Sequence, residues 1–209
     1  MESFLILPMT MTVPLGNLPK SSPIVVAPQV VLSQQLNMEA SNILAFNQAV
    51  DQKAQTITLE NKALAIDTYF KEHDMPLAGM GKKMVEEAEN NGLDWRLVAA
   101  ISVNESTGGK FACKTVKFNP FGWGSCKIGF DSYDDAIETV ARNLGGNEPK
   151  TAHHYDGKTT EEILDSYNPH EIAPKYIKQM KSIMDDIGDN FTEIAKINTT
   201  NTNNKITSA

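Results

Sequence analysis

The chain has 209 residues, a formal net charge of −7 and a pI near 5.1, with 41% hydrophobic and 22% charged residues. This length suffices for one domain with a hydrophobic core and two tails. The acidic balance argues against a nucleic-acid-binding protein, because phosphate contacts need a clustered basic surface. It also argues against docking on anionic lipid. No apolar run approaches the ~20 residues of a membrane-spanning helix, so we expect no membrane span.

The two ends of the chain differ in composition from its middle. Five of the ten prolines fall within the first 28 residues, which disfavours both helix and central strand there. The apolar stretch Phe4–Leu7 is short and has no basic residue before it, so an export signal is not clear. We expect residues 1–56 to form a flexible leader in which 38–50 form a looser helix. Residues 191–209, rich in threonine and asparagine, are expected to form a disordered polar tail.

Between these ends, residues 57–190 show apolar residues at helical spacing, which predicts a single helical domain. Residues 110–130 lack this period and are expected to form a small irregular or partly β insert. The predicted fold class is therefore mainly α. The signals for individual helices are the stripe Leu59, Ala63, Ile66 and Phe70; Met80 to Ala88; Asp94 to Glu105; capping positions Ser132 and Thr159; and Pro174 to Ile187, ended by Gly188.

The two cysteines, Cys113 and Cys126, fit neither a zinc-ribbon nor a CxxC spacing. They can form one disulfide, worth roughly 3 kcal/mol in the chain-entropy model, or remain two buried thiols. A zinc site that adds His153 and His154 is disfavoured, because adjacent histidines rarely reach one ion. We expect no metal. If the disulfide forms, the protein works outside the reducing cytosol.

Glu105 is the candidate catalytic residue. It lies in the last turn of its expected helix, where the negative end of the helix dipole favours the protonated carboxyl group. Partial burial against aromatic side chains would also raise its pKa. A carboxylic acid that keeps its proton near neutral pH can protonate the departing oxygen of a sugar. An isolated glutamate at a helix end is otherwise more often a solvated surface residue.

Four motifs that occur in order give Glu105 a context. Residues Ala99–Ser106 resemble the catalytic helix of the lysozyme-like superfamily, whose Glu-Ser pair supplies the acid. Asn119–Gly124 resembles the Asn-x-Phe-Gly motif of the bacterial endo-β-N-acetylglucosaminidases of glycoside hydrolase family 73, and Phe130–Ile137 resembles the start of that family's next helix. Ser166–Pro169, followed by Pro174–Tyr176, is similar to the Tyr-Asn segment that closes the site in soluble lytic transglycosylases.

The resemblance implies a lysozyme-like fold, in which a helical lobe and the insert enclose a groove for a peptidoglycan strand. It implies Glu105 as the general acid, no cofactor, and an extracytoplasmic location (periplasmic, cell-wall or secreted). A disulfide between Cys113 and Cys126 would then make the groove rigid. The side chains expected to bind the N-acetylated glycan are Ser106, Asn119, Phe121, Trp123, Tyr133, Tyr155, Tyr167 and Asn168; for the aromatic residues, core packing is the alternative role.

The chain departs from the family pattern in its acidic residues. No aspartate or glutamate lies between Glu105 and Asp131, so Asp131 is the candidate second acid by elimination. The gap favours the single-acid chemistry of lytic transglycosylases over two-carboxylate hydrolysis. The sequence therefore predicts a peptidoglycan-cleaving glycosidase of the endo-β-N-acetylglucosaminidase, muramidase or lytic transglycosylase type. The alternative is a non-catalytic glycan-binding or structural module on the same fold. The linkage cut, the product and the oligomeric state stay open.

Overall fold

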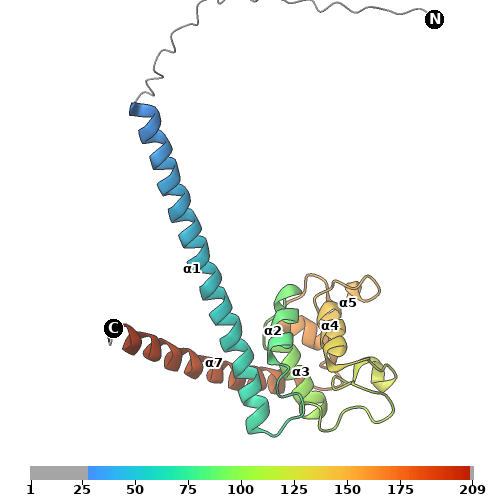
Figure 1. The fold of residues 1–209 in the computed structure, drawn as a ribbon. Coiled ribbons are helices and arrows are strands. Elements are labelled where there is room, and N and C mark those ends of the chain that lie inside the picture. Colours follow the sequence, from blue (N-terminus) through green and yellow to red (C-terminus); the bar gives the residue numbers. More distant parts are fainter. Residues whose placement is uncertain (1–27, 208–209) are drawn as a thin grey trace, which may run out of the picture. The chain divides into compact units, whose positions relative to one another are not determined.

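The computed structural model describes the backbone of residues 28–207, and the chain divides into two compact units, 1–48 and 49–209, which we describe separately (Figure 1). Every regular element among the described residues is a helix, which confirms a mainly α fold; the partly β alternative for the insert is not seen in this part of the chain. The elements are α1 (Pro28–Glu72), α2 (Gly81–Asn90), α3 (Leu97–Ser106), the short 3-10 helix η1 (Trp123–Cys126), α4 (Tyr133–Leu144), α5 (Ala152–Tyr155), α6 (Thr160–Tyr167) and α7 (Tyr176–Thr207).

Helix α1 begins at Pro28, a residue suited to the first turn of a helix because it lacks an N–H. The expected helix over 38–50 is confirmed, but helix extends over the whole of 28–56, where we expected a flexible leader. The physical reason is composition: residues 29–72 contain neither glycine nor proline, and many are good helix formers. Side chains of residues 36–58 are exposed. The apolar stretch Phe4–Leu7 and the prolines before Pro28 lie outside the described residues.

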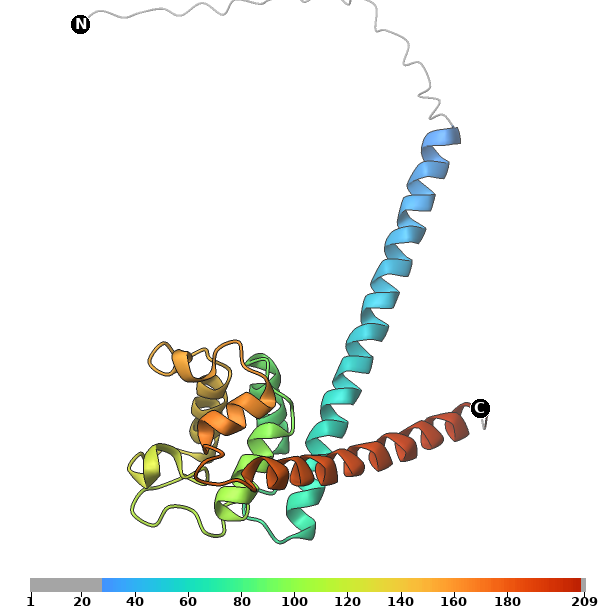
Figure 2. The same cartoon turned by 180° about the vertical axis from the view of Figure 1, so that it is seen from behind.

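The core of the second unit is organised around α3. Residues Leu97–Ser102 of this helix are completely buried, and α3 contacts α2, α4 and α7. Figures 1 and 2 show these helices gathered into one bundle. Ile66 and Phe70, from the predicted stripe on α1, are also fully buried. Because α3 is enclosed, its C-terminal end is held in a fixed position, and Glu105 lies in that last turn.

Two predicted capping residues start helices as expected. The hydroxyl of Ser132 accepts a hydrogen bond from the N–H of Asp135 at 3.1 Å at the start of α4. Thr159 and Glu162 form a reciprocal capping box at the start of α6, with the Thr159 N–H donating to the Glu162 carboxylate at 2.8 Å. These caps satisfy backbone donors that would otherwise lack partners, and so fix where both helices begin.

The C-terminal end corrects the sequence prediction. Helix α7 does not end at Gly188 and residues 191–207 are helical, where we expected a disordered tail. The ring of Phe191 packs against Trp95 with centroids 5.6 Å apart, and the side chain of Asn198 donates to that of Asn61 at 2.7 Å. The tail composition is polar, but Phe191 and Asn198 give the helix contacts with side chains of the domain.

Gly188 has a packing role inside α7 instead of ending the helix. A Cβ atom at this position would lie 3.2 Å from Nη1 of Arg96. That guanidinium donates to the carbonyl of Met184 at 3.2 Å and forms a bidentate contact with Asp94. Glycine therefore allows the arginine to lie close against the helix. None of the described helices is long and apolar enough to cross a membrane.

Candidate active site

The insert between α3 and α4 is closed by the predicted disulfide, since Cys113 and Cys126 are bonded with their Cα atoms 5.4 Å apart. Asn119 lies at the centre of the closed loop. Its Nδ2 donates to the carbonyls of Trp123 and Ile128, both at 2.9 Å, and its Oδ1 accepts from the Trp123 N–H at 3.0 Å. Asn119 is fully buried, and its side-chain amide is occupied by these three hydrogen bonds. It therefore shapes the insert, which corrects the prediction that it contacts glycan.

Ser106 joins the end of α3 to the insert. Its hydroxyl donates to the carbonyl of Pro120 at 2.6 Å and accepts from the N–H of Gly109 at 2.9 Å. The side chain is buried, with 3% exposure, so its expected sugar contact is also corrected. The serine fixes the position of its neighbour Glu105 relative to the insert, which is a positioning role.

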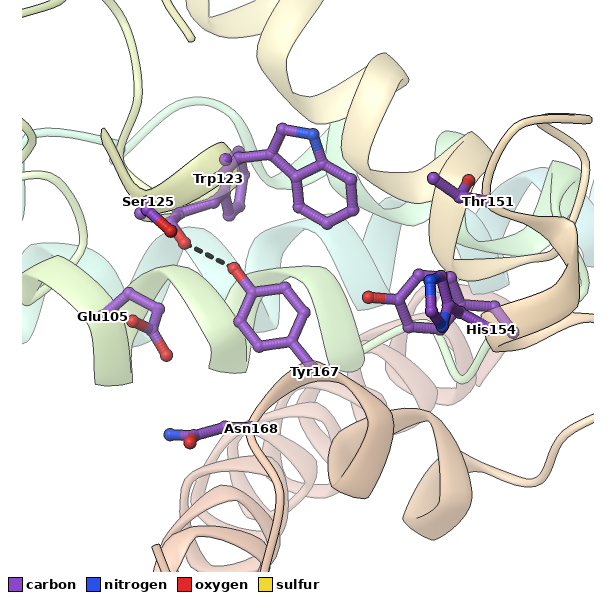
Figure 3. A pocket seen from close by; sticks show the side chains of 11 residues that line it. Glu105, Trp123, Ser125, Thr151, His154, Tyr167 and Asn168 are labelled. Carbon is purple, nitrogen blue, oxygen red and sulfur yellow. Dashed lines mark hydrogen bonds between the residues drawn. The ribbon is translucent and has the colours of Figure 1, made fainter. Parts of the chain in front are cut away.

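A pocket of about 470 Å³ lies beside the end of α3, a size typical of small-molecule sites. It brings together six of the predicted site residues: Glu105, Phe121, Trp123, Tyr155, Tyr167 and Asn168. Figure 3 shows Glu105 and Asn168 towards one end and His154 towards the other, with Trp123 and Tyr167 between them. The remaining lining residues are Gly122, Gly124, Ser125, Thr151 and His154.

Besides Ser106 and Asn119, two further predicted site residues, Tyr133 and Asp131, do not line this pocket. Tyr133 packs edge-to-face against Phe118, with ring centroids 5.3 Å apart. Asp131 is exposed, and its N–H donates to the carboxylate of Asp135 at 3.0 Å. Glu105 is therefore the one carboxylate among the residues that line the pocket.

The five additional lining residues are not predicted as site residues from the sequence. Gly122 has a structural reason to be glycine, because it adopts a left-handed φ of +64°. A Cβ atom there would also lie 3.4 Å from Oε2 of Glu105. For His154 the sequence favours a place in a polar loop before Thr159 over a zinc site, and the structure places it in the short helix α5. Its ring lies against that of His153, with centroids 3.9 Å apart, and the described residues contain no cluster of three metal-binding side chains.

The aromatic residues of the pocket contact one another. The hydroxyl of Tyr167 donates to the carbonyl of Phe121 (Figure 3), and its ring lies 6.0 Å from that of Trp123. Tyr167 also stacks on Tyr176, with centroids 6.4 Å apart and planes 9° apart. Phe121 is fully buried, so its side chain belongs to the core. Tyr155 is 8% exposed and forms a wall, whereas Trp123 is only partly buried.

Glu105 combines burial with one defined hydrogen bond. Its Oε1 accepts from the hydroxyl of Tyr176 at 3.1 Å. Burial raises the pKa of Glu105, hydrogen bonds from Tyr176 and Asn104 lower it in part, and the net shift is upward. Burial also raises the pKa of Tyr176 far above its ordinary value, so this tyrosine remains a protonated donor. Tyr176 was missed as a site residue, although it ends one of the motifs that carry the resemblance.

The fold and the site define a class: a mainly helical domain with a half-buried carboxyl group, whose pKa is raised by burial, in an aromatic-walled pocket beside a disulfide-closed insert. The chain matches no protein-family model, no curated protein and no solved structure.

The raised pKa predicts how stability depends on pH. The pKa of Glu105 in the folded state exceeds its ordinary value of 4.5. Its contribution to stability is therefore complete below that value and is lost as pH rises through the folded-state pKa. Because glutamine stays neutral, Glu105→Gln should melt at the wild-type temperature at acid pH and at a higher temperature at neutral pH. Thermal melts across this range test the prediction, with the exposed Glu60→Gln as control. A difference in Tm between wild-type protein and Glu105→Gln that is the same at all pH values would contradict the prediction.

Proposed function

We propose that this protein cleaves the β-1,4 glycan strand of peptidoglycan, that its fold is lysozyme-like, and that Glu105 is the general acid. The observation that carries the proposal is the state of Glu105: its pKa is raised by burial, and it is the one carboxylate lining the pocket. A glycosidase acid needs its proton at the pH where the enzyme works. The ordered motifs that resemble the lysozyme-like superfamily supply the substrate class.

One carboxylate in the pocket favours a reaction with a single acid. Glu105 donates its proton to the glycosidic oxygen as the bond from the sugar C1 to that oxygen breaks. The resulting carboxylate then takes the proton of the 6-hydroxyl group of the same sugar, and that oxygen bonds to C1. The product has a 1,6-anhydro end, Glu105 has its proton back, and no water is consumed. This is the reaction of a lytic transglycosylase, and it needs no cofactor.

The pocket walls suit an N-acetylated sugar. The partly exposed ring of Trp123 gives a flat apolar surface for a pyranose ring. Tyr155 and Tyr167 form the wall beside it, and the amide of Asn168 faces the pocket near Glu105 (Figure 3). In this proposal these four side chains hold the sugar whose bond is cut. The disulfide supports an extracytoplasmic location, because such bonds persist in oxidising compartments.

Digestion of purified sacculi tests the proposal. The wild-type protein should release soluble muropeptides, which mass spectrometry detects. If no muropeptides are released and the protein stays bound to the sedimented sacculi, cleavage is contradicted and a glycan-binding module is indicated. If the protein neither releases muropeptides nor binds sacculi, peptidoglycan is excluded as its substrate.

Tyr176→Phe should alter the pH profile in a defined direction. The substitution removes the hydrogen bond that lowers the pKa of Glu105. The pKa of Glu105 therefore rises, and the alkaline limb of kcat/KM should shift to higher pH, because the acid keeps its proton longer. The matched control is Tyr133→Phe, which removes a hydroxyl outside the pocket. An unchanged limb, or one shifted to lower pH, would show that Tyr176 does not act through Glu105.

A further inference from the structure

The insert is basic, although the chain as a whole carries a net charge of −7. Between Glu105 and Asp131 there are four lysines and no acidic residue: Lys110, Lys114, Lys117 and Lys127. A concentration of one sign of charge against the sign of the whole molecule creates a local field that attracts an oppositely charged ligand.

Among the described residues, three of these lysines have amino groups without a partner. The amine of Lys110 is engaged, because it donates to the carbonyl of His73 at 2.9 Å. Lys114, Lys117 and Lys127 are exposed, and none of them forms a salt bridge or a side-chain hydrogen bond with another described residue. We refer to these three residues as the lysine surface.

The backbone of the insert brings the lysine surface together. Lys114 follows Cys113 and Lys127 follows Cys126, the two residues joined by the disulfide. The hydroxyl of Thr115 also donates to the carbonyl of Cys126 at 3.2 Å. Further along, the N–H of Phe130 donates to the carbonyl of Lys117 at 3.0 Å. The three lysines therefore lie on two cross-linked segments of one small lobe.

This lobe adjoins the pocket directly. The N–H of Lys127 donates to the carbonyl of Gly124 at 3.1 Å, and that of Cys126 donates to the carbonyl of Gly122 at 3.3 Å. Both glycines line the pocket together with Glu105. The segment that carries Lys127 is therefore hydrogen-bonded to the backbone of residues that line the pocket.

Apolar side chains are exposed beside the lysines. Ile128, next to Lys127, is 45% exposed, and Phe118, next to Lys117, is 38% exposed. A ligand that matches this surface carries negative charges together with short alkyl groups. A bare sugar strand has neither feature at this density.

We propose that the lysine surface binds the carboxylates of the peptide stems that branch from the glycan strand held in the pocket. This inference rests on the proposed function and narrows its substrate to strands that carry stems with free carboxylates. The stems of peptidoglycan are short peptides with several carboxylates and with alanine methyl groups, which match the amines and the apolar side chains. The remainder of the acidic chain repels anionic polymers, so the lysine surface also fixes which side of the protein faces the wall.

Sedimentation with teichoic-acid-free sacculi measures this binding without cleavage if Glu105→Gln is used as the parent protein. Adding Lys114→Gln, Lys117→Gln and Lys127→Gln should weaken binding by about five- to tenfold, because three exposed ion pairs are lost. The matched control replaces three exposed lysines elsewhere, Lys53, Lys71 and Lys178, by glutamine and should bind like the parent. Sacculi whose carboxylates are converted to methylamides with carbodiimide and methylamine should bind the parent as weakly as untreated sacculi bind the triple variant.

Several outcomes would overturn the inference. Equal binding of the parent to untreated and amidated sacculi would exclude the carboxylates, as would equal binding of parent and triple variant. A dependence on the three lysines that is seen only with sacculi retaining teichoic acid would assign the surface to phosphodiesters instead. Release of muropeptides by the wild-type protein together with any of these results leaves the proposed cleavage intact, so the two proposals fail separately.

Discussion

Replacing Glu105 by glutamine should lower kcat for release of muropeptides from sacculi by about 10²–10⁴-fold, the range in which general acids contribute. Glutamine keeps the shape of the side chain and accepts the hydrogen bond from Tyr176, but it has no proton to give to the leaving oxygen. Binding to sacculi should change little, because the sugar contacts remain. The measurement is the initial rate of release by wild-type and variant protein at equal occupancy of the substrate.

Asp131→Asn is the matched control for this loss, since it also converts a carboxylate to an amide. Asp131 is exposed and does not line the pocket, so the variant should keep wild-type kcat. A loss of similar size in Asp131→Asn would indicate a two-carboxylate mechanism. A Glu105→Gln variant with wild-type kcat would remove Glu105 from the reaction.

Removing the disulfide by Cys113→Ser and Cys126→Ser should lower both stability and activity. The bond closes a short loop, with a sequence separation of 13 residues, and its loss should cost about 3 kcal/mol in the chain-entropy model. For a unit of this size that corresponds to a fall in Tm of roughly 6–12 °C. Five of the pocket-lining residues lie inside the loop, Phe121 to Ser125. Because a displacement of about 1 Å can cost 10²-fold, kcat/KM should fall by about that factor.

Dithiothreitol gives an internal control for this prediction. The reductant should bring the wild-type protein to the Tm and activity of the double-serine variant, and it should leave that variant unchanged. Wild-type activity in the double-serine variant, with a Tm within about 2 °C of wild type, would show that the loop holds its shape without the disulfide.

The sequence was most informative where local chemistry decides the structure. Helical period and capping residues such as Ser132 and Thr159 predicted where the helices of the domain lie. Glu105 was placed correctly in the last turn of its helix, and the raised pKa was predicted in direction. Two causes were expected, the helix dipole and burial. Burial is the larger cause in the structure.

The sequence was less informative where side chains far apart in the chain meet. Asn119 and Ser106 are polar residues in motifs that resemble those of glycan-cleaving enzymes, yet their partners are backbone groups of the insert, which only the folded loop brings within reach. Tyr176 reaches Glu105 across 71 positions of the chain. The helical tail was missed for a related reason: the ring of Phe191 needs Trp95, and neither residue alone predicts the contact.

The central claim is that Glu105 acts alone as acid and then as base. The most direct measurement is mass spectrometry of the muropeptides that the wild-type protein releases in water enriched in oxygen-18. The single-acid reaction predicts new ends that are lighter than hydrolysed ends by one water and that contain no oxygen-18. New reducing ends of full mass that carry the label would contradict the account, because water and not the sugar's own hydroxyl would then have attacked C1.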